Sequence, residues 1–131
     1  MILLDTCALI FDALAPERLS DKALQAIENG DKRGALACSD ISLWEIGMLT
    51  SRGRLEVGVD LLSFLRLILS ARMIQPLMIV PEIAQISTND GLFAHYDPAD
   101  RIIAATALHH DLPLVTCDTA LQSIGGLKTI W

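Results

Sequence analysis

The sequence predicts a single α/β domain spanning residues 1–131, in which a mainly parallel sheet of four or five strands lies between two layers of helices. Three observations support this three-layer α/β/α class. The length of 131 residues suits one domain, since single domains cluster near about 100–150 residues. Short apolar runs alternate along the chain with helix-like segments. Strands separated by helices require crossover connections, which place parallel strands in one sheet with helices on both faces.

The first half of the chain contains two expected strands. The run Met1–Leu4 ends at Asp5, and the run Ala35–Cys38 is similarly short and apolar. Between them, Leu19–Asn29 places apolar side chains at helical spacing, and Gly30 is expected to end this helix. The other segments expected to be helical in this half are Ala8–Leu14 and Ile41–Thr50, the second ending near Gly53.

The second half begins with Val59–Ala71, whose apolar stripe is wider than one core face requires. Two interpretations are open: the segment binds a second copy of the chain or a partner helix in a groove, or it is a helix buried on two sides. Pro81 is expected to open a short helix through Ile86, since proline is favoured at the first helical position. The remaining expected elements are an extended segment at Met73–Val80, a helix at Pro98–His109, and strands at Leu112–Thr116 and Leu127–Trp131.

The composition excludes several classes of protein. Hydrophobic residues make up 52% of the chain and the mean hydropathy is +0.45, which excludes a disordered protein. Polar residues interrupt the most apolar stretch, Val57–Val80, before it reaches the ~18 residues of a membrane-spanning helix. The start MILLD lacks the basic residues of a signal peptide. The three cysteines, Cys7, Cys38 and Cys117, show no zinc or redox spacing, and we expect a cytoplasmic protein with reduced thiols.

The acidic residues of the chain point to its chemistry. A net charge of −6 argues against a typical nucleic-acid-binding protein, but carboxylates gathered to hold cations produce the same balance. Five acids lie where expected strands end or where the adjoining helices run: Asp5, Glu45, Asp97, Asp100 and Asp118. If the strands are parallel neighbours, these acids meet at the carboxyl edge of the sheet, where ligands bind in such folds. Converging carboxylates repel one another unless a divalent cation neutralises them, and Mg²⁺ prefers oxygen ligands.

Each acid also has a structural explanation. Helix N-caps would explain three of them: Asp5, Asp97 and Asp118. Ser42 and Glu45 have the spacing of a capping box. Asp100 would fall in the first turn of its helix, where the helix dipole favours any acid. Taken together the five acids favour a site, because independent caps need not share one edge of a sheet.

Four segments resemble, in order, the motifs of PIN-domain ribonucleases, and most closely those of the VapC-type toxins of bacterial toxin–antitoxin pairs. These segments are MILLDTCALI, SDISLWEIGML, DPADRIIAATAL and PLVTCD. The resemblance runs over nearly the whole chain. It places the family's acidic quartet on Asp5, Glu45, Asp100 and Asp118, with Asp97 as an additional acid. Thr6 and Thr116 lie where the family often has a hydroxyl that orients a carboxylate or a metal-bound water. Cys117 departs from the polar residue usual before the last acid.

The resemblance implies an endoribonuclease that depends on Mg²⁺ or Mn²⁺, a small antitoxin protein that occupies its site, and a homodimer. Metal stabilises the negative charge that grows on the attacking and leaving oxygens when a phosphodiester is cleaved. We assign Asp5, Asp100 and Asp118 as the core of the metal site. Glu45 is either a ligand or the group that accepts the proton of the attacking water, and Asp97 is a supporting acid.

An acidic cleft needs cations to bind RNA. The candidates are Arg52 and Arg54, just beyond the helix that carries Glu45, and Arg101, next to Asp100. A solvated turn is the alternative for the first two, and an ion pair with Asp97 is the alternative for Arg101. Trp44, among apolar neighbours on a short helix, is expected in the core or at an interface rather than as a platform for base stacking.

Two other functions share part of this sequence pattern. A receiver-like phospho-acceptor domain would have a similar length, a parallel sheet and bound magnesium, but it needs a lysine ending the last strand. The only late lysine, Lys128, lies inside the last apolar run. The second alternative is a catalytically inactive PIN fold that only binds a partner, against which the complete acidic quartet argues.

Overall fold

The computed structural model describes all 131 residues, from Met1 to Trp131. The chain forms five strands, which are β1 (Ile2–Leu4), β2 (Leu36–Ser39), β3 (Gln75–Leu77), β4 (Leu114–Val115) and β5 (Thr129–Ile130). Between them lie α1 (Thr6–Leu14), α2 (Asp21–Lys32), α3 (Asp40–Ser51), α4 (Leu61–Ala71), α5 (Pro81–Ser87), α6 (Asp90–Phe93), α7 (Pro98–His110) and α8 (Thr119–Gln122). A short 3-10 helix, η1 (Pro16–Arg18), follows α1.

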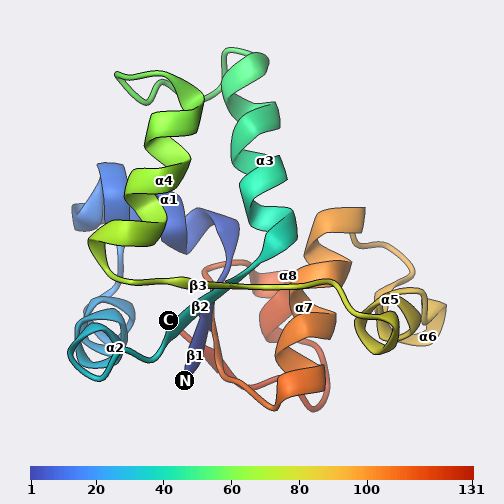
Figure 1. The fold of residues 1–131 in the computed structure, drawn as a ribbon. Helices are drawn as coiled ribbons and strands as arrows, with labels where there is room; N and C mark the ends of the chain where they lie inside the picture. The colour runs from blue at the N-terminus through green and yellow to red at the C-terminus, as the bar shows by residue number, and fades with distance from the viewer.

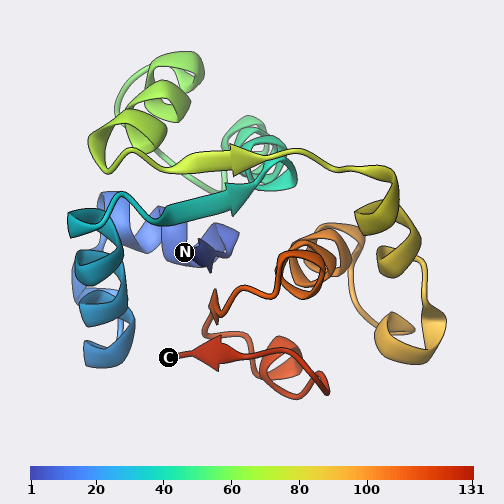
Figure 2. The same ribbon diagram turned by 60° about the horizontal axis from the view of Figure 1, so that its bottom comes forward.

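The five strands form one sheet in the order β3-β2-β1-β4-β5, and every neighbouring pair is parallel. In Figure 2 the strands lie side by side with β3 and β5 at the two edges. The central strand β1 pairs Leu4 with Cys38 of β2 and with Val115 of β4. The predicted α/β class is therefore confirmed, with all five strands parallel.

Helices cover both faces of the sheet (Figure 1). Side chains alternate between the faces along a strand, so Leu4 packs with α1, α2 and α4 while Leu3 packs with α7 and α8. One hydrophobic core contains Leu9, Ile27 and Phe64 from the helices on the first face. The other contains residues of α6, α7 and α8. The three inner strands, β1, β2 and β4, are thus buried on both faces, which explains why they are apolar at nearly every position.

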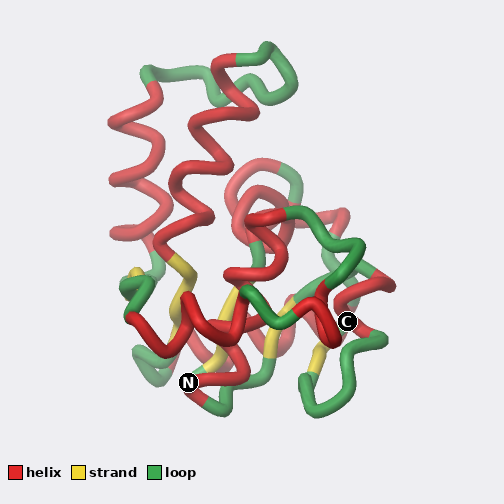
Figure 3. Tube along the Cα trace, turned by 90° about the vertical axis from the view of Figure 1, so that its right-hand side faces the viewer, coloured by secondary structure: helices red, strands yellow, loops and turns green.

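Helices α3 and α4 pack side by side and project together beyond the sheet (Figures 1 and 3). Only one side of α4 is buried: Phe64 and Ile68 face the core, while Leu62 and Leu67 are 56% and 58% exposed. Burial of this helix on two sides is therefore wrong for the single chain. Its broad apolar stripe leaves a hydrophobic surface that the chain does not cover.

The expectation that Gly30 ends its helix is also wrong. Helix α2 continues to Lys32, and the chain turns at Gly34, which has a φ of +61°. Gly30 lies inside the helix, where a Cβ would stand 2.5 Å from Leu36 Cδ2. The glycine is a packing requirement between α2 and β2. No helix of the structure has the length and apolar character needed to span a membrane.

Candidate active site

The carboxyl edge of the sheet brings the predicted acids together. Asp5 directly follows β1, and its backbone N–H donates to Val115 O (3.1 Å), which ties the end of β1 to β4. Asp118 comes three residues after β4. Helix α7 leads back into β4, so its first turn, with Asp97 and Asp100, starts at this same edge. Glu45 lies in α3, which leaves the end of β2.

Asp5 combines burial with helix capping. Its side chain is buried, and Oδ1 accepts a hydrogen bond from Ala8 N–H (2.7 Å) at the N-terminus of α1. Burial raises the pKa of Asp5, and the nearby Asp118 adds to this rise. Hydrogen bonds from Thr116 and Ala8 oppose it by stabilising the carboxylate. The capping explanation for Asp5 is correct, and the same carboxylate faces another acid.

Thr116 links two of the acids. Its hydroxyl hydrogen-bonds to the Asp5 carboxylate and accepts a hydrogen bond from Asp118 N–H (3.1 Å). Asp118 in turn caps α8, since its Oδ1 accepts from Ala120 N–H (2.8 Å). The buried hydroxyl therefore fixes the distance between the end of β1 and the turn after β4.

Asp97 is the N-cap of α7: its Oδ1 accepts from Asp100 N–H (2.8 Å), and Pro98 occupies the first helical position. Asp100 is half-buried, and its pKa is raised to about 7, first by burial and then by four neighbouring carboxylates. These neighbours are Asp97, Glu45, Asp118 and Asp5. The structure therefore places the four other predicted acids within electrostatic reach of Asp100.

Glu45 is held by a residue far away in the sequence. Its Oε1 accepts a hydrogen bond from the Thr6 hydroxyl, which also contacts Ser42 Oγ (3.0 Å). Burial raises the pKa of Glu45, and Asp97 and Asp5 raise it further. The capping-box alternative is wrong, because the N-cap of α3 is Ser39 and Ser42 lies inside the helix. Glu45 Oε2 has no hydrogen bond within the chain.

The chemistry of these groups suits a hard cation. The side chains offer oxygen ligands, and neighbouring carboxylates raise the pKa values of Asp5, Glu45 and Asp100. As the side chains stand, no three His, Cys, Asp or Glu residues converge closely enough to hold one ion. The arrangement is thus a set of mutually repelling carboxylates whose charge a divalent cation would neutralise.

A cavity of about 240 Å³ opens beside Glu45, between one face of α3 and the start of α7. Arg52 and Arg54 line it together with Glu45 and Asp97. Neither arginine forms an ion pair within the chain. The structure therefore places these two predicted cations next to the acidic group.

Arg101 has a different environment. Its guanidinium pairs with Asp90 Oδ1 (3.2 Å) and donates to Ser87 O (3.3 Å) and Tyr96 O (3.4 Å). The alternative ion pair with Asp97 is wrong, because the side chain reaches back to α5 and α6. Arg101 holds these helices against α7, so its guanidinium is already occupied by contacts within the chain.

Trp44 is a lining residue that sequence reasoning missed. Its side chain is 58% exposed and lines the cavity beside Glu45, so the core position is wrong, while the predicted alternative of an interface stays a prediction. Trp44, Met48 and Arg52 are spaced four residues apart and share one face of α3. That spacing is the signal in the sequence that associates the indole with the predicted cation.

The receiver-like alternative fails on the position of its lysine. Lys128 pairs with Asp111 (3.4 Å) just beyond the end of α7. Because α7 runs from the carboxyl edge of the sheet back to the amino edge, this pair lies away from the acidic group. The chain has no lysine at the edge where a receiver domain needs one.

Comparison with known proteins agrees with this geometry. The family model described as PIN domain matches residues 2–127. Ribonuclease VapC22 of Mycobacterium tuberculosis is 35% identical over 122 residues, which are 93% of this chain and 90% of that protein. Two solved structures share the fold: VapBC2 from Rickettsia felis bound to a promoter DNA fragment, and a toxin–antitoxin complex from Klebsiella pneumoniae.

The Rickettsia structure has a TM-score of 0.71 at 20% identity, covering 98% of this chain and 97% of that one. The Klebsiella structure has a TM-score of 0.63 at 24% identity, covering 97% and 95%. The family model and the mycobacterial relative each match nearly the whole chain, and the acids of the family's motifs meet at one edge of the sheet. The chain therefore belongs to the PIN domain family and, within it, to the VapC-type ribonucleases.

Proposed function

We propose that this protein is a metal-dependent endoribonuclease that acts as the toxin of a toxin–antitoxin pair. The observation that carries the proposal is the half-buried Asp100, whose pKa is raised to about 7 by burial and by four other carboxylates. Such a concentration of negative charge is costly for a fold to keep unless a cation uses it. The proposed place of action is the cytoplasm, where RNA is available and the three free cysteines stay reduced.

Asp5, Asp100 and Asp118 are the proposed ligands of Mg²⁺ or Mn²⁺, with Asp97 as a supporting acid. When bound, the ion would stabilise negative charge on the attacking and leaving oxygens of the phosphodiester. Thr116 positions Asp5 relative to Asp118, and Thr6 fixes Oε1 of Glu45. Glu45 Oε2 then remains to accept a proton from the attacking water.

The RNA backbone is proposed to enter along α3. Arg52 and Arg54 line the cavity that also contains Glu45, so they supply positive charge beside an acidic group that would otherwise repel phosphate. Arg101 is left out of this set because its guanidinium is engaged by Asp90, Ser87 and Tyr96.

The test is RNA cleavage by the purified chain with Mg²⁺ and with EDTA. Asp5→Asn and Asp100→Asn should each abolish the metal-dependent cleavage while circular dichroism stays unchanged. Asp60→Asn is a matched control: Asp60 caps α4 through Ser63 N–H (2.9 Å) and lies outside the acidic group. Cleavage at the wild-type rate by both site variants would refute the proposal, as would cleavage that EDTA leaves unchanged.

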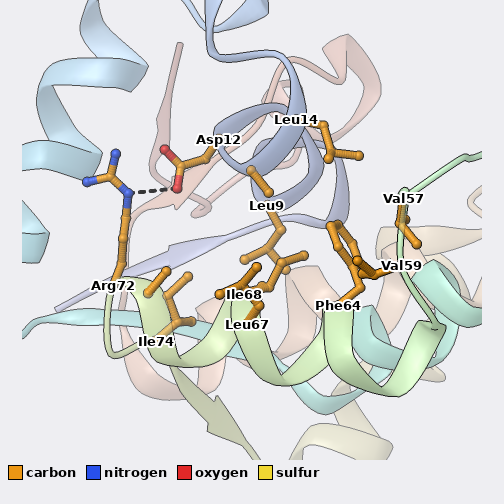
Figure 4. A pocket seen from close by; sticks show the side chains of 12 residues that line it. Leu9, Asp12, Leu14, Val57, Val59, Phe64, Leu67, Ile68, Arg72 and Ile74 are labelled. Carbon is orange, nitrogen blue, oxygen red and sulfur yellow. Dashed lines mark hydrogen bonds and ion pairs between the residues drawn. The ribbon is translucent and has the colours of Figure 1, made fainter.

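The antitoxin is proposed to bind the apolar groove between α1 and α4 (Figure 4). The groove encloses a cavity of about 340 Å³, lined mainly by apolar side chains that include Leu9, Leu14 and Leu67. At one end Arg72 pairs with Asp12 Oδ2 (2.8 Å), while Asp12 Oδ1 is buried without a hydrogen-bond partner. This end offers unused acceptor capacity to a donor on an incoming amphipathic helix. Solved relatives are toxin–antitoxin complexes, which supports this occupant.

Two leucines of α4 test the groove. Leu67 lines the cavity and Leu62 does not, although their exposures are 58% and 56%. Leu67→Asp should prevent binding of the small protein encoded beside this chain's gene, while Leu62→Asp should leave binding intact. Both variants should keep RNA cleavage. If Leu67→Asp instead converts a homodimer to a monomer in light scattering and leaves antitoxin binding intact, the groove is the surface between two copies.

A further inference from the structure

The cavity beside Glu45 contains an aromatic ring that the catalytic residues do not need. The indole of Trp44 is 58% exposed, although the residues before and after it on α3 are half-buried. It stacks on no other aromatic ring, and no cation of the chain lies over its face. The other tryptophan, Trp131, instead packs against Phe11 with ring centroids 6.4 Å apart. A ligand can therefore reach the exposed part of the Trp44 ring from the cavity.

The position of Trp44 relates it to both ends of the cavity. It is adjacent in sequence to Glu45, the proposed proton acceptor, and Met48 and Arg52 continue the same helix face toward the cationic end. The eight residues from Trp44 to Arg52 rise about 12 Å along the helix axis. One wall of the cavity thus presents an indole and an acid at one end, then a thioether, and a guanidinium at the other end.

An exposed indole and a guanidinium in one cavity match two parts of a nucleotide chain. An arginine binds phosphate, and an exposed indole binds the flat face of a base. A partner protein that covered an apolar surface would meet mostly hydrophobic residues, but this cavity is lined by two arginines and two acids as well. The mixture favours a ligand that carries negative charge and an aromatic face together.

We propose that Trp44 stacks on the base of a nucleotide next to the cleaved phosphodiester, with the adjoining backbone phosphate on Arg52 or Arg54. The proposal rests on the ribonuclease function proposed above and assigns the residue that orients single-stranded RNA in that site. Stacking tolerates every base, because each base has a π face, so Trp44 contributes to binding more than to recognition of one sequence. It is a positioning residue for the substrate.

The experiment combines truncation of the ring with removal of the base. Trp44→Ala should raise KM for a short single-stranded RNA by about tenfold or more, while Trp44→Phe retains most of the binding. Synthetic RNAs that lack one base on either side of the cleaved bond supply the second change. At the stacked position, loss of the base should raise the KM of the wild type by a similar factor. On that abasic RNA, Trp44→Ala should raise KM no further. Leu62→Ala, an equally exposed truncation on α4, should leave KM unchanged.

Each other outcome has a definite meaning. A wild-type KM for Trp44→Ala refutes the stacking proposal. It is also refuted if Trp44→Ala raises KM by the same factor on intact RNA and on both abasic RNAs. If Trp44→Ala raises KM and also lowers the molar mass of the protein in light scattering, Trp44 contacts a second copy of the chain. That outcome also refutes the stacking proposal. If the wild type cleaves no RNA, the proposed ribonuclease function itself fails, and stacking fails with it.

Discussion

The hydroxyl of Thr6, at the start of α1, donates a hydrogen bond to Glu45 Oε1 on α3, 39 residues away in the sequence. This contact joins the helix that follows the central strand to the helix that follows its neighbour. It fixes one oxygen of Glu45 and leaves the other without a partner in the chain. The geometry of the acidic group therefore depends on a residue that carries no charge.

Thr6→Val is expected to lower metal-dependent RNA cleavage by about tenfold, because groups that orient the acids of a metal site typically affect activity by about 10–100-fold. The change keeps the shape of the side chain and removes only the hydroxyl. Thr6→Ser restores the hydroxyl and should restore most of the activity. Steady-state cleavage at saturating Mg²⁺ measures both variants, and equal rates for Thr6→Val and wild type would show that Glu45 needs no such support.

Magnesium should stabilise the folded chain against heat, since a ligand that binds only the folded state adds to its stability. At about 100 times its Kd, Mg²⁺ should contribute about 2.7 kcal/mol, or a rise in Tm on the order of 5–10 °C. Asp118→Asn should remove most of this rise. The variant keeps the cap of α8, because asparagine caps a helix as well as aspartate. A melting temperature that is insensitive to Mg²⁺ in the wild type would contradict the metal assignment.

Stability of the metal-free protein should depend on pH through Asp100. Its pKa is about 7 in the folded state, against an ordinary value of 3.8 for an aspartate, so between these two pH values the folded state holds a proton that the unfolded state releases. The stabilising contribution is present at low pH and is lost as the pH rises toward and through about 7. Asp100→Asn removes the titration. In EDTA, its Tm relative to wild type should therefore increase between pH 5 and pH 8.5.

Asp60 is expected to contribute to stability with the opposite pH dependence. Hydrogen bonds from Ser63 lower the pKa of Asp60, so its contribution is present above its unfolded pKa and is lost as the pH falls through the folded value. Asp60→Asn should show no relative gain between pH 5 and pH 8.5. A common trend in the two variants would mean that the general acidity of the chain, and not Asp100, governs the pH dependence.

Gly30→Ala should destabilise the fold by about 1–3 kcal/mol, because the new Cβ would stand 2.5 Å from Leu36 Cδ2. Replacement of glycine by alanine in a helix usually has the opposite effect, a gain of about 0.5–1 kcal/mol. Gly47→Ala in α3 is the matched control, since its nearest side-chain atom, Leu61 Cδ2, would lie 3.5 Å away. Urea unfolding midpoints of the two variants should move in opposite directions.

Local patterns account for what the sequence predicts correctly. The three inner strands, β1, β2 and β4, are short apolar runs with an acid one to three residues beyond their ends, and Asp97 followed by Pro98 starts α7. Since all the strands are parallel, their carboxyl ends lie at one edge, and the five acids follow from topology once the strands are found. The expected hydroxyls at Thr6 and Thr116 both contact carboxylates of the group.

The errors concern contacts between distant segments. Gly30 has the pattern of a helix end, but its actual neighbour is Leu36 on β2. Arg101 is spaced to meet Asp97, yet the short α6, which the pattern does not reveal, presents Asp90 instead. Trp44 sits among apolar residues, but its face of α3 opens onto a cavity. Helical periodicity gives the relative angles of side chains and not what lies opposite them.

Helix capping by the acidic residues has a consequence for mutations that inactivate the protein. Asp5 and Asp118 each support the start of a helix with a side-chain oxygen that asparagine also possesses. One transition in an aspartate codon produces asparagine. We expect such a mutation to yield an inactive protein that is still folded and still binds its antitoxin. In a cell that inherits it, the inactive protein would compete with any active copy for that antitoxin.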